Sequence, residues 1–518
     1  MHFFVARVRR DCILQNVTAF QCVESESYVK EDERKKLSTV SLPAQIPSQA
    51  LPHAKKTIAK LTLWPLVAAT FFMVSGGTYG TEAIISGAGY GHGILVLLFL
   101  PVLWCLPTAF MIGELSSALP AEGGYYAWVR RGLGNFWGFQ EAWLSLAASI
   151  FDMAIYPTLF TIYLKQMVPW FGEGHYEILG GMVTLNHGLL AALFVVVTCV
   201  ALNLAGIRVV GLTSVWLFFL LSLPFALIVL LSPAKTGAVA DPHAVSAGAS
   251  VGLLGAVLVA MWNYMGWDNA STIAQEVERP RKTYPRAMIA AVVLVSLTYI
   301  LPFLAVYFTG TPASAFNAEG SWATIAGALG GSIGGFQWLR FMVTLGGVMS
   351  AFGMFNALVL SYSRLPLAMA RDGMLPRVFG KVTKKTETPW VSIIVCAVCW
   401  MPCLVLGFQR LVTLDIMLYG AALMLEFVTL VALRMREPKL RREFLVPGGM
   451  AGAVTCGLFP MALLIVAMVE SDHESILGMN ALLFGVLIIL AGFAVYIATG
   501  GLRAKYAAEI TPEATEAA

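Results

Sequence analysis

The segment Val74–Ala83, VSGGTYGTEA, interrupts a hydrophobic stretch that runs from about Leu61 to Ile85. Its glycines and its glutamate are unfavourable in a lipid-facing helix, because glycine weakens the helix and a carboxylate is costly to bury. A break here frees backbone N–H and C=O groups that lipid cannot satisfy, so these groups must face protein, water or a ligand. The segment therefore predicts a discontinuous membrane helix.

The composition predicts a polytopic membrane protein. The chain has 518 residues, of which 58% are hydrophobic and 12% charged, and its mean hydropathy is +0.75. Soluble domains have about 25% charged residues, so a soluble fold is excluded. The net charge of +4 does not indicate nucleic-acid binding, because the basic residues follow membrane topology instead.

About twenty apolar residues cross a bilayer as a helix. Twelve such segments are predicted: 62–86, 94–118, 136–165, 186–204, 209–232, 251–275, 287–309, 336–361, 389–407, 411–433, 453–470 and 477–499. Residues 1–60 lack a signal-peptide pattern and are expected to form a disordered cytoplasmic tail. Their first residues, MHFFVARVRRDCILQ, are atypical enough to leave the true start open, and 501–518 form a second short tail.

The distribution of basic residues predicts the orientation. With both termini cytoplasmic, all but four of the 34 Lys and Arg lie on the inner side, the exceptions being Lys165, Lys235, Arg340 and Arg410. Such asymmetry is the positive-inside pattern. We therefore expect a multi-pass protein of the cell (plasma or inner) membrane with both termini in the cytoplasm.

A second interruption lies in the sixth segment, where 263–269 read NYMGWDN. Gly76 and Gly266 are 190 residues apart, so the two interruptions are separated by five spans. Glycine clusters also serve helix packing, but a pair of polar breaks in corresponding positions indicates a transporter binding site. The spacing predicts two five-helix inverted repeats, 61–232 and 251–433, followed by two extra helices within 453–499.

Four acidic residues inside the spans are candidates for proton coupling: Glu82, Asp152, Asp268 and Glu426. Each ionised group costs roughly 2.5–3.5 kcal/mol at the bilayer centre, so each needs a reason to be there. A carboxylate in an apolar cavity can hold a proton, and several around one cavity suit an ammonium substrate. An alternative for Glu426 is pairing with a basic group at the inner surface.

Other residues are assigned from their positions. Tyr156 shares a helix face with Asp152, and Tyr264 or Trp267 offers a cation–π surface to an ammonium group. Glu114 and Glu276 lie at the cytoplasmic boundary and are expected to form gate or loop salt bridges. Glu141, near the inner end of the third span, is expected to reach water.

Five long motifs resemble the amino acid–polyamine–organocation transporter family, and within it the branch of polyamine:proton symporters. They occur in order over about 60–470: VSGGTYGTE at 74–82, ELSSALPAEGGYYAWVRRGLGNFWGFQEAW at 114–143, DMAIYPTLF at 152–160, WDNASTIAQEVERPRKTYPRA at 267–287 and SRLPLAMARDGMLPRVFGKVTKKTETPW at 363–390. Two features depart from the pattern of that branch: the charge of Glu141, and Thr78-Tyr79 in place of bulkier apolar residues.

The resemblance implies an all-α, leucine-transporter-type fold of 12 transmembrane helices, with the substrate between the unwound parts of spans 1 and 6 and flanked by spans 3, 8 and 10. It also implies a substrate-binding set: Ser75, Gly76 and Gly77 through their backbones, Trp267 as an occluding lid, Asp268 beside it, and Glu82 and Asp152 as a negative field. Residues 310–335 are then an outer cover, the alternative being an ordinary flexible loop.

The buried acids favour protons as the coupling ion. Sodium remains an alternative, because the eighth span offers oxygen ligands from Thr344, Ser350 and Asn356. The fifth span lacks the lysine that some proton-coupled relatives carry. The leading hypothesis is a symporter that takes up polyamines or cationic amino acids with protons by alternating access. The alternative is a neutral or broad-range amino acid permease or exchanger.

Other classes fit less well. A channel needs a continuous polar stripe, and the spans contain no metal, nucleophile-elbow or phosphate-loop pattern of an enzyme. Cys396, Cys399 and Cys403 lie in an apolar span and are interpreted as small hydrophobic residues. No cofactor or metal is expected. The expected partners are a small-molecule substrate, a proton and the lipid bilayer, and the sequence carries no indication of an oligomeric state.

Overall fold

The computed structural model describes residues 60–500 except Glu122, His175, 179–182, 236–238, 247–248, 250–251, 333–334, Phe336, 471–474 and 477–478. The chain divides into the units Met1–Ile58 and Ala59–Ala518, and all described residues belong to the second. The tails expected at 1–60 and 501–518 therefore lie outside the described residues, apart from Lys60.

Both predicted helix breaks are present. Helix α3 (Leu63–Val74) ends at the first break, and α4 (Glu82–Leu100) begins after it. Helix α10 (Leu253–Asn263) ends at the second break and is followed by the 3-10 helix η5 (Trp267–Glu276).

The first two predicted spans, 62–86 and 94–118, are separated by a sharp turn within α4. Gly89 has a non-helical φ of 70° and ψ of 172°, and the N–H of Gly91 donates to the carbonyl of Pro242 over 2.8 Å and not to the preceding helical turn. A π-helix, η2 (Pro101–Cys105), and α5 (Leu106–Ala118) then complete this arm. Glycine permits the turn because it adopts positive φ without steric cost.

Helices overlap all the other predicted segments: α7 (Asn135–Met167), α8 (Gly188–Ala205), α9 (Ile207–Leu231), α11 (Pro280–Phe308), α13 (Trp338–Tyr362), α15 (Trp390–Trp400), α16 (Phe408–Arg436), α17 (Gly449–Glu470) and α18 (Ala481–Ala498). Among the described residues, eight helical stretches are long and apolar enough to cross a membrane, and α3, α18 and the stretch Trp390–Val405 are shorter apolar helices.

The remaining elements are short. They are the helices α6 (Tyr125–Leu133), α12 (Trp322–Ser332) and α14 (Arg364–Arg371), the 3-10 turns η3 (Pro169–Gly172), η4 (Ser232–Ala234), η6 (Ala313–Phe316), η7 (Arg377–Gly380) and η8 (Met401–Val405), and two antiparallel strand pairs, β1 (Tyr176–Ile178) with β2 (Val183–Leu185) and β3 (Ser475–Ile476) with β4 (Met479–Asn480).

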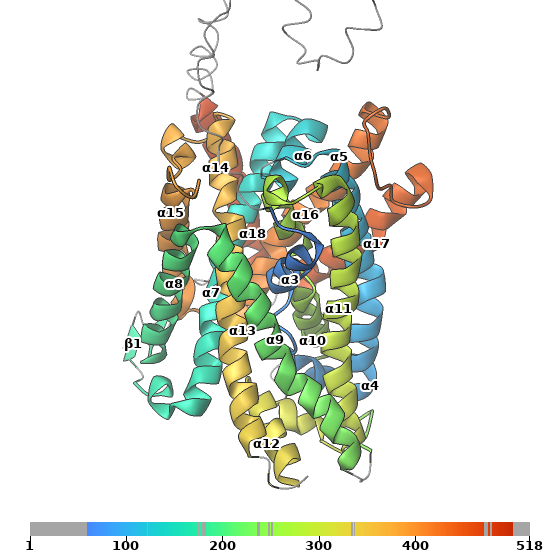
Figure 1. Ribbon diagram of the computed structural model, residues 1–518, viewed down its shortest axis with the longest axis vertical. Coiled ribbons are helices and arrows are strands. Elements are labelled where there is room, and N and C mark those ends of the chain that lie inside the picture. Colours follow the sequence, from blue (N-terminus) through green and yellow to red (C-terminus); the bar gives the residue numbers. More distant parts are fainter. Residues whose placement is uncertain are drawn as a thin grey trace, which may run out of the picture. The chain divides into compact units, whose positions relative to one another are not determined.

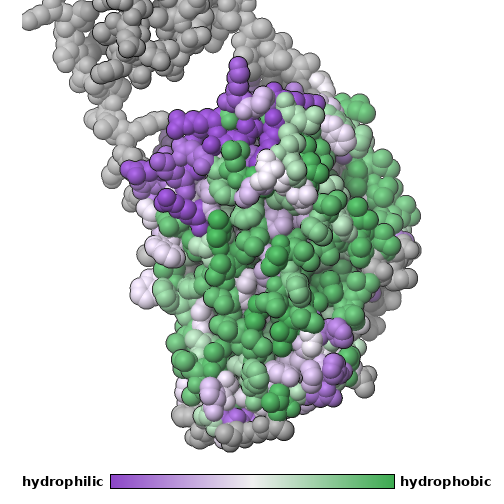
Figure 2. All heavy atoms as spheres, turned by 90° about the vertical axis from the view of Figure 1, so that its right-hand side faces the viewer, coloured by the Kyte–Doolittle hydropathy of each residue, from purple (hydrophilic) through white to green (hydrophobic). Residues whose placement is uncertain are grey.

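The two broken spans occupy the interior of the helix bundle (Figure 1). Helix α3 packs against α9, α11 and α13, and α10 packs against α4 and α16. Hydrophobic side chains such as Trp216, Phe219 and Leu230 on α9 face outward. Figure 2 shows a broad hydrophobic band on one face, with hydrophilic residues gathered at one end of it. This surface suits lipid, while the interior surrounds the breaks.

Candidate substrate site

The first break is shaped by a close approach of α13. The side chain of Ser75 accepts a hydrogen bond of 3.0 Å from the N–H of Gly77, whose φ is 77°. A Cβ on Gly76 would overlap the side chains of Ser350 and Met354, and the Ser350 hydroxyl donates to the Gly76 carbonyl. Position 76 thus requires glycine for space and position 77 for its backbone conformation.

The second break touches the first. Gly266 has a φ of 87°, and a Cβ there would collide with the carbonyl oxygen of Met73 at the end of α3. The Gly266 N–H donates to the hydroxyl of Tyr419 over 3.1 Å, and the carbonyl of Tyr264 accepts from the indole of Trp267 over 2.7 Å. Protein groups therefore satisfy backbone atoms that the break frees.

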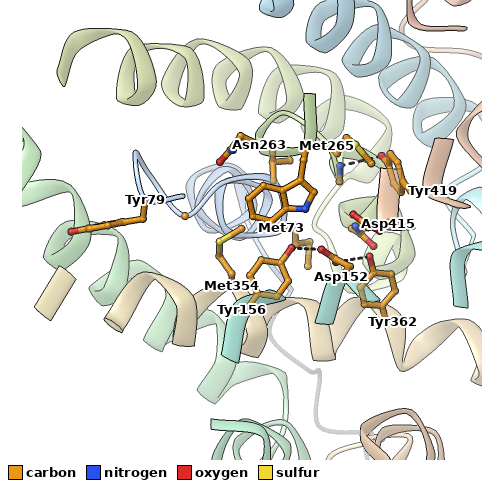
Figure 3. A pocket seen from close by; sticks show the side chains of 15 residues that line it. Met73, Tyr79, Asp152, Tyr156, Asn263, Met265, Met354, Tyr362, Asp415 and Tyr419 are labelled. Atoms are coloured by element: carbon orange, nitrogen blue, oxygen red, sulfur yellow. Dashed lines mark hydrogen bonds between the residues drawn. The ribbon is translucent and has the colours of Figure 1, made fainter. Parts of the chain in front are cut away.

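A small cavity lies between the two breaks (Figure 3). It is lined by residues of both breaks and of α7, α13 and α16, and its volume of about 20 Å³ is room for about one water molecule. No basic side chain lines it among the described residues, whereas the carboxyl groups of Asp152 and Asp415 do. The electrostatic character of this cavity is therefore negative.

Asp152 is held by two tyrosines. Its Oδ1 accepts from the Tyr156 hydroxyl over 2.6 Å, and its Oδ2 accepts from Tyr362 of α13 over 2.9 Å (Figure 3). Both tyrosines also line the cavity. The predicted i, i+4 pairing of Asp152 with Tyr156 is present, and Tyr362 adds a partner from another helix.

Asp415 is a site residue that the sequence analysis missed. It lies on α16 in LVTLDIMLYG, is 3% exposed, and its Oδ1 has no hydrogen-bond partner among the described residues. Its charge interacts with those of Asp152 and Asp268. The sequence did contain a signal for it, namely an acidic residue inside an apolar span. The same criterion led to Glu82, Asp152, Asp268 and Glu426.

Asp268, Tyr264 and Trp267 are buried but do not line the cavity. Asp268 accepts a hydrogen bond from Tyr419, a lining residue, and so lies directly behind it. The Tyr264 hydroxyl donates to the carbonyl of Leu97, away from the cavity. Among the lining residues, Trp262 supplies the indole, with its ring centroid 6.4 Å from that of Tyr156.

Glu82 connects the first break to the segment 310–335. Its Oε1 accepts from the Tyr163 hydroxyl over 2.6 Å and from the Gly320 N–H over 3.2 Å. Gly320 belongs to 310–335, which carries the helices η6 and α12 and is therefore partly helical where the structure describes it. Glu82 is 4% exposed and does not line the cavity.

On the side of the cavity opposite Glu82, the chain just before α3 forms backbone hydrogen bonds with the end of η5. Leu61 donates its N–H to the carbonyl of Glu276 and accepts from the N–H of Glu278, both over 2.8 Å. The Glu276 carboxylate forms a 2.7 Å ion pair with Arg364 of α14. These contacts join both broken spans below the cavity.

Glu114 forms a buried ion-pair cluster. It is completely buried, accepts hydrogen bonds from Arg434 and from the backbone N–H of Val446, the latter over 2.8 Å, and forms an ion pair with Arg442 at 3.3 Å. The cluster ties the end of α5 to the end of α16 and to the loop that follows.

One expectation and one alternative about the acids were wrong. Glu141 does not reach water, because it is completely buried on α7. Glu426 does not pair with a basic group: it is 1% exposed, and neither carboxyl oxygen has a hydrogen-bond partner in the part of the chain that the structure describes.

Of the nine predicted substrate-binding residues, three line the cavity: Gly76, Asp152 and Tyr156. The other six do not line it: Ser75, Gly77, Glu82, Tyr264, Trp267 and Asp268. The proposed sodium ligands point to different partners, since Thr344 donates to Arg340, Ser350 to Gly76, and the Asn356 amide oxygen accepts from Asn203. The described residues contain no group of three or more potential metal ligands.

Comparisons with known proteins give a consistent picture. The profile of the family described as amino acid permease matches residues 67–497. The chain is 33% identical over 460 residues to the polyamine transporter RMV1 of Arabidopsis thaliana, covering 87% of this chain and 88% of the relative. It is 33% identical over 447 residues to the polyamine transporter PUT1 of Oryza sativa subsp. japonica, with 85% and 78% covered. It is 26% identical over 401 residues to the serine/threonine exchanger SteT of Bacillus subtilis, with 76% and 86% covered.

Proposed function

The chain belongs to the amino acid permease family, a family of membrane transporters and not of enzymes, and we propose that it takes up polyamines or cationic amino acids together with protons. The observation that carries the proposal is the pair Asp152 and Asp415 on a cavity that no described basic residue lines. Two carboxylates in such a place attract cationic substrates, and ammonium groups satisfy their charge. The polyamine transporters among the relatives support the same substrate class.

The half-helices around the cavity favour a cation over a carboxylate. The carboxyl ends of α3 and α10 contribute Val74 and Asn263 to the lining, and helix carboxyl ends carry partial negative charge. At the two amino ends beyond the breaks, Glu82 and Asp268 occupy the first turns. The protein's own acids thus occupy the positions where a substrate carboxylate would find the positive end of a helix.

The coupling ion in this proposal is the proton. Glu82, Asp152, Asp268 and Glu426 are all buried, and none forms an ion pair with a basic residue among the described residues. A buried carboxyl group without a cation is best accommodated by a proton. Asp152, which lines the cavity, then serves both the substrate and the proton.

Transport by alternating access requires this site to open to each side in turn. The cavity of about 20 Å³ is far below the roughly 300–1,000 Å³ of sites that hold small molecules, so substrate entry needs an opening movement. We assign the outer closure to the contacts of Glu82 with Tyr163 and Gly320. The inner closure is then the pairing of Leu61 with 276–278 and the ion pair of Glu276 with Arg364.

The proposed topology has twelve membrane crossings in a leucine-transporter-type fold. Repeats at about 61–232 and 251–433 would each begin with a broken helix, and two extra helices follow within 453–499. The abundance of Lys and Arg on one side supports cytoplasmic tails at 1–60 and 501–518. In this proposal the protein resides in the plasma or inner membrane.

The similarity to a serine/threonine exchanger supports a second candidate function, a neutral or broad-range amino acid permease or exchanger. In that case the buried acids serve coupling alone. The two candidate functions differ in which compounds compete for transport. Polyamines and cationic amino acids compete in the first, and neutral amino acids compete in the second.

Putrescine uptake into proteoliposomes tests the proposal. Purified protein is reconstituted, and uptake is measured with and without an acidic exterior, alone and with excess spermidine, arginine or serine. The proposal predicts gradient-stimulated uptake that spermidine inhibits and serine does not. Uptake of serine without uptake of putrescine would establish the second candidate instead.

A further inference from the structure

Helices α7 and α16 each carry a second carboxyl group eleven residues from the one that lines the cavity. On α7, Glu141 precedes Asp152 by eleven residues, and on α16, Glu426 follows Asp415 by eleven. Eleven residues make about three helical turns, so the two acids of each helix share one face and lie about 16 Å apart along the axis. Both helices are continuous over these intervals.

The second pair lies towards the same end of both helices, because α7 and α16 pack side by side in opposite directions. Arg131, just before α7, forms a 2.8 Å ion pair with Glu437, just after α16. The start of α7 and the end of α16 therefore coincide. Asp152 and Asp415 form an upper acidic pair at the cavity, and Glu141 and Glu426 form a lower acidic pair nearer the proposed cytoplasmic side.

The lower acidic pair is buried and under-satisfied. Glu141 accepts one hydrogen bond, from the Ser145 hydroxyl over 2.8 Å, and its Oε2 has no partner in the described chain. Both carboxyl oxygens of Glu426 lack a partner as well. The hydroxyl of Tyr125 from α6 is fully buried beside Ser145, interacts electrostatically with both glutamates, and makes no hydrogen bond within the described residues.

No basic residue in the described part of the chain forms an ion pair with either glutamate. Burial has the largest effect on Glu426, and the charges that act on it are those of Asp268 and Glu141, both of which are acidic. Two titratable groups of the neighbouring α17 and α18 face elsewhere: Cys456 lies near Glu114 and Arg434, and the ring of Tyr496 packs on Phe136 and Phe139. Burial of two ionised carboxylates costs several kcal/mol for each, so a proton is the simplest counter-charge.

Asp268 connects the two pairs. Its charge interacts with Asp152 and Asp415 of the upper acidic pair and with Glu141 and Glu426 of the lower acidic pair. It also accepts from the hydroxyl of Tyr419, which lines the cavity. Acidic groups and hydroxyls thus follow one another from the cavity down the interface of α7 and α16.

We propose that the lower acidic pair, Glu141 and Glu426 with Tyr125, is a proton-binding site through which the coupling proton leaves the cavity for the cytoplasm. The inference rests on the proposed function and adds to it a site separate from the one that holds the substrate. The proton passes from a cavity carboxyl group through Asp268 to a lower glutamate, and then to cytoplasmic water, which restores the charge of the cavity acid. The lower glutamates make no contact with the substrate.

The test compares two kinds of putrescine transport in proteoliposomes carrying Glu141→Gln, Glu426→Gln and the double variant. Glutamine has the shape of a protonated glutamate, so these variants are expected to fold. Exchange of labelled for unlabelled putrescine needs no net proton movement and should be retained. Accumulation driven by a pH gradient should be abolished in the double variant, while Glu443→Gln in the cytoplasmic loop should behave as the parent.

Infrared spectra provide a readout that does not depend on transport. At neutral pH the parent should show the C=O stretching band of a protonated, buried carboxyl group, and this band should lose intensity in Glu426→Gln. Gradient-driven accumulation by the double variant equal to that of the parent would overturn the proton site and leave the proposed function intact. Failure of the parent itself to respond to a pH gradient would overturn proton coupling and this pathway together, whatever the infrared band shows.

Discussion

The hydroxyl of Tyr163 on α7 lies 2.6 Å from Oε1 of Glu82, the first residue of the helix beyond the first break. The same oxygen accepts from the backbone of Gly320 in the outer segment. One carboxyl group therefore joins a broken span, a neighbouring continuous helix and the segment that covers them. Any opening of the outer side changes the surroundings of Glu82, which makes it suitable for coupling protonation to opening.

Replacement of Glu82 tests this role. Glu82→Gln should remove most gradient-driven uptake, because the amide keeps the size of the side chain but cannot gain or lose a proton. Glu173→Gln is the control, since that side chain is exposed and follows the short helix η3. Equal uptake by both correctly inserted variants would show that Glu82 is only structural.

Gly266 is expected to be irreplaceable for steric reasons. Gly266→Ala forces a positive φ on alanine, which costs roughly 1–2 kcal/mol, and it also directs a methyl group at the Met73 carbonyl. Uptake should be lost although the protein inserts. Gly335→Ala separates the two effects, because Gly335 also has a positive φ of 76° but has open space around its Cβ position. That variant should transport nearly normally.

Asp415 should determine the preference for substrates with two ammonium groups. Asp415→Asn removes a charged acceptor worth about 1.5–3 kcal/mol in a buried hydrogen bond, which corresponds to roughly a ten- to hundredfold higher KM for putrescine. The KM for a substrate with one ammonium group should change less. Competition curves with the two kinds of amine measure the difference, and equal losses for both would contradict the assignment.

The cluster around Glu114 should contribute stability. Glu114→Gln leaves Arg434 and Arg442 without their buried partner, and loss of one member of a buried ion pair costs about 3–5 kcal/mol. The thermal unfolding temperature of the purified protein should fall clearly. Glu437→Gln breaks the more exposed pair with Arg131, where a loss of about 0–1 kcal/mol is expected. Similar decreases in the unfolding temperature for the two variants would contradict the distinction between a buried and a more exposed ion pair.

The pair of Arg131 and Glu437 also has a defined pH dependence. The Arg131 guanidinium holds the pKa of Glu437 below its ordinary value. Since the folded-state pKa is lowered, the contribution of this pair is present at neutral pH and is lost as the pH falls through that lowered pKa. Unfolding temperatures of the parent and Glu437→Gln should therefore converge in acid.

The helix breaks could be predicted from sequence because glycine and acidic residues are rarely tolerated in lipid-facing helix. The same reasoning located Asp152 and Gly76 at the cavity. It missed Asp415, although that residue meets the same criterion as Glu426 on the same helix.

Other features depend on tertiary packing that no single stretch of sequence encodes. The direction of the Trp267 ring follows from its hydrogen bond to the Tyr264 carbonyl, so the indole that lines the cavity is Trp262 instead. Glu141 was expected to reach water because of its place near a helix end, but α6 and α16 pack against α7 there and bury it. Helix position alone does not reveal which neighbours cover a side chain.

The most direct test of the central claim is equilibrium binding of putrescine to the purified protein. The parent should bind labelled putrescine saturably, excess serine should not displace it, and Asp152→Asn combined with Asp415→Asn should bind none while remaining folded. Binding of serine but not putrescine by the parent, or putrescine binding that survives loss of both carboxylates, would contradict a dication site between the two broken helices.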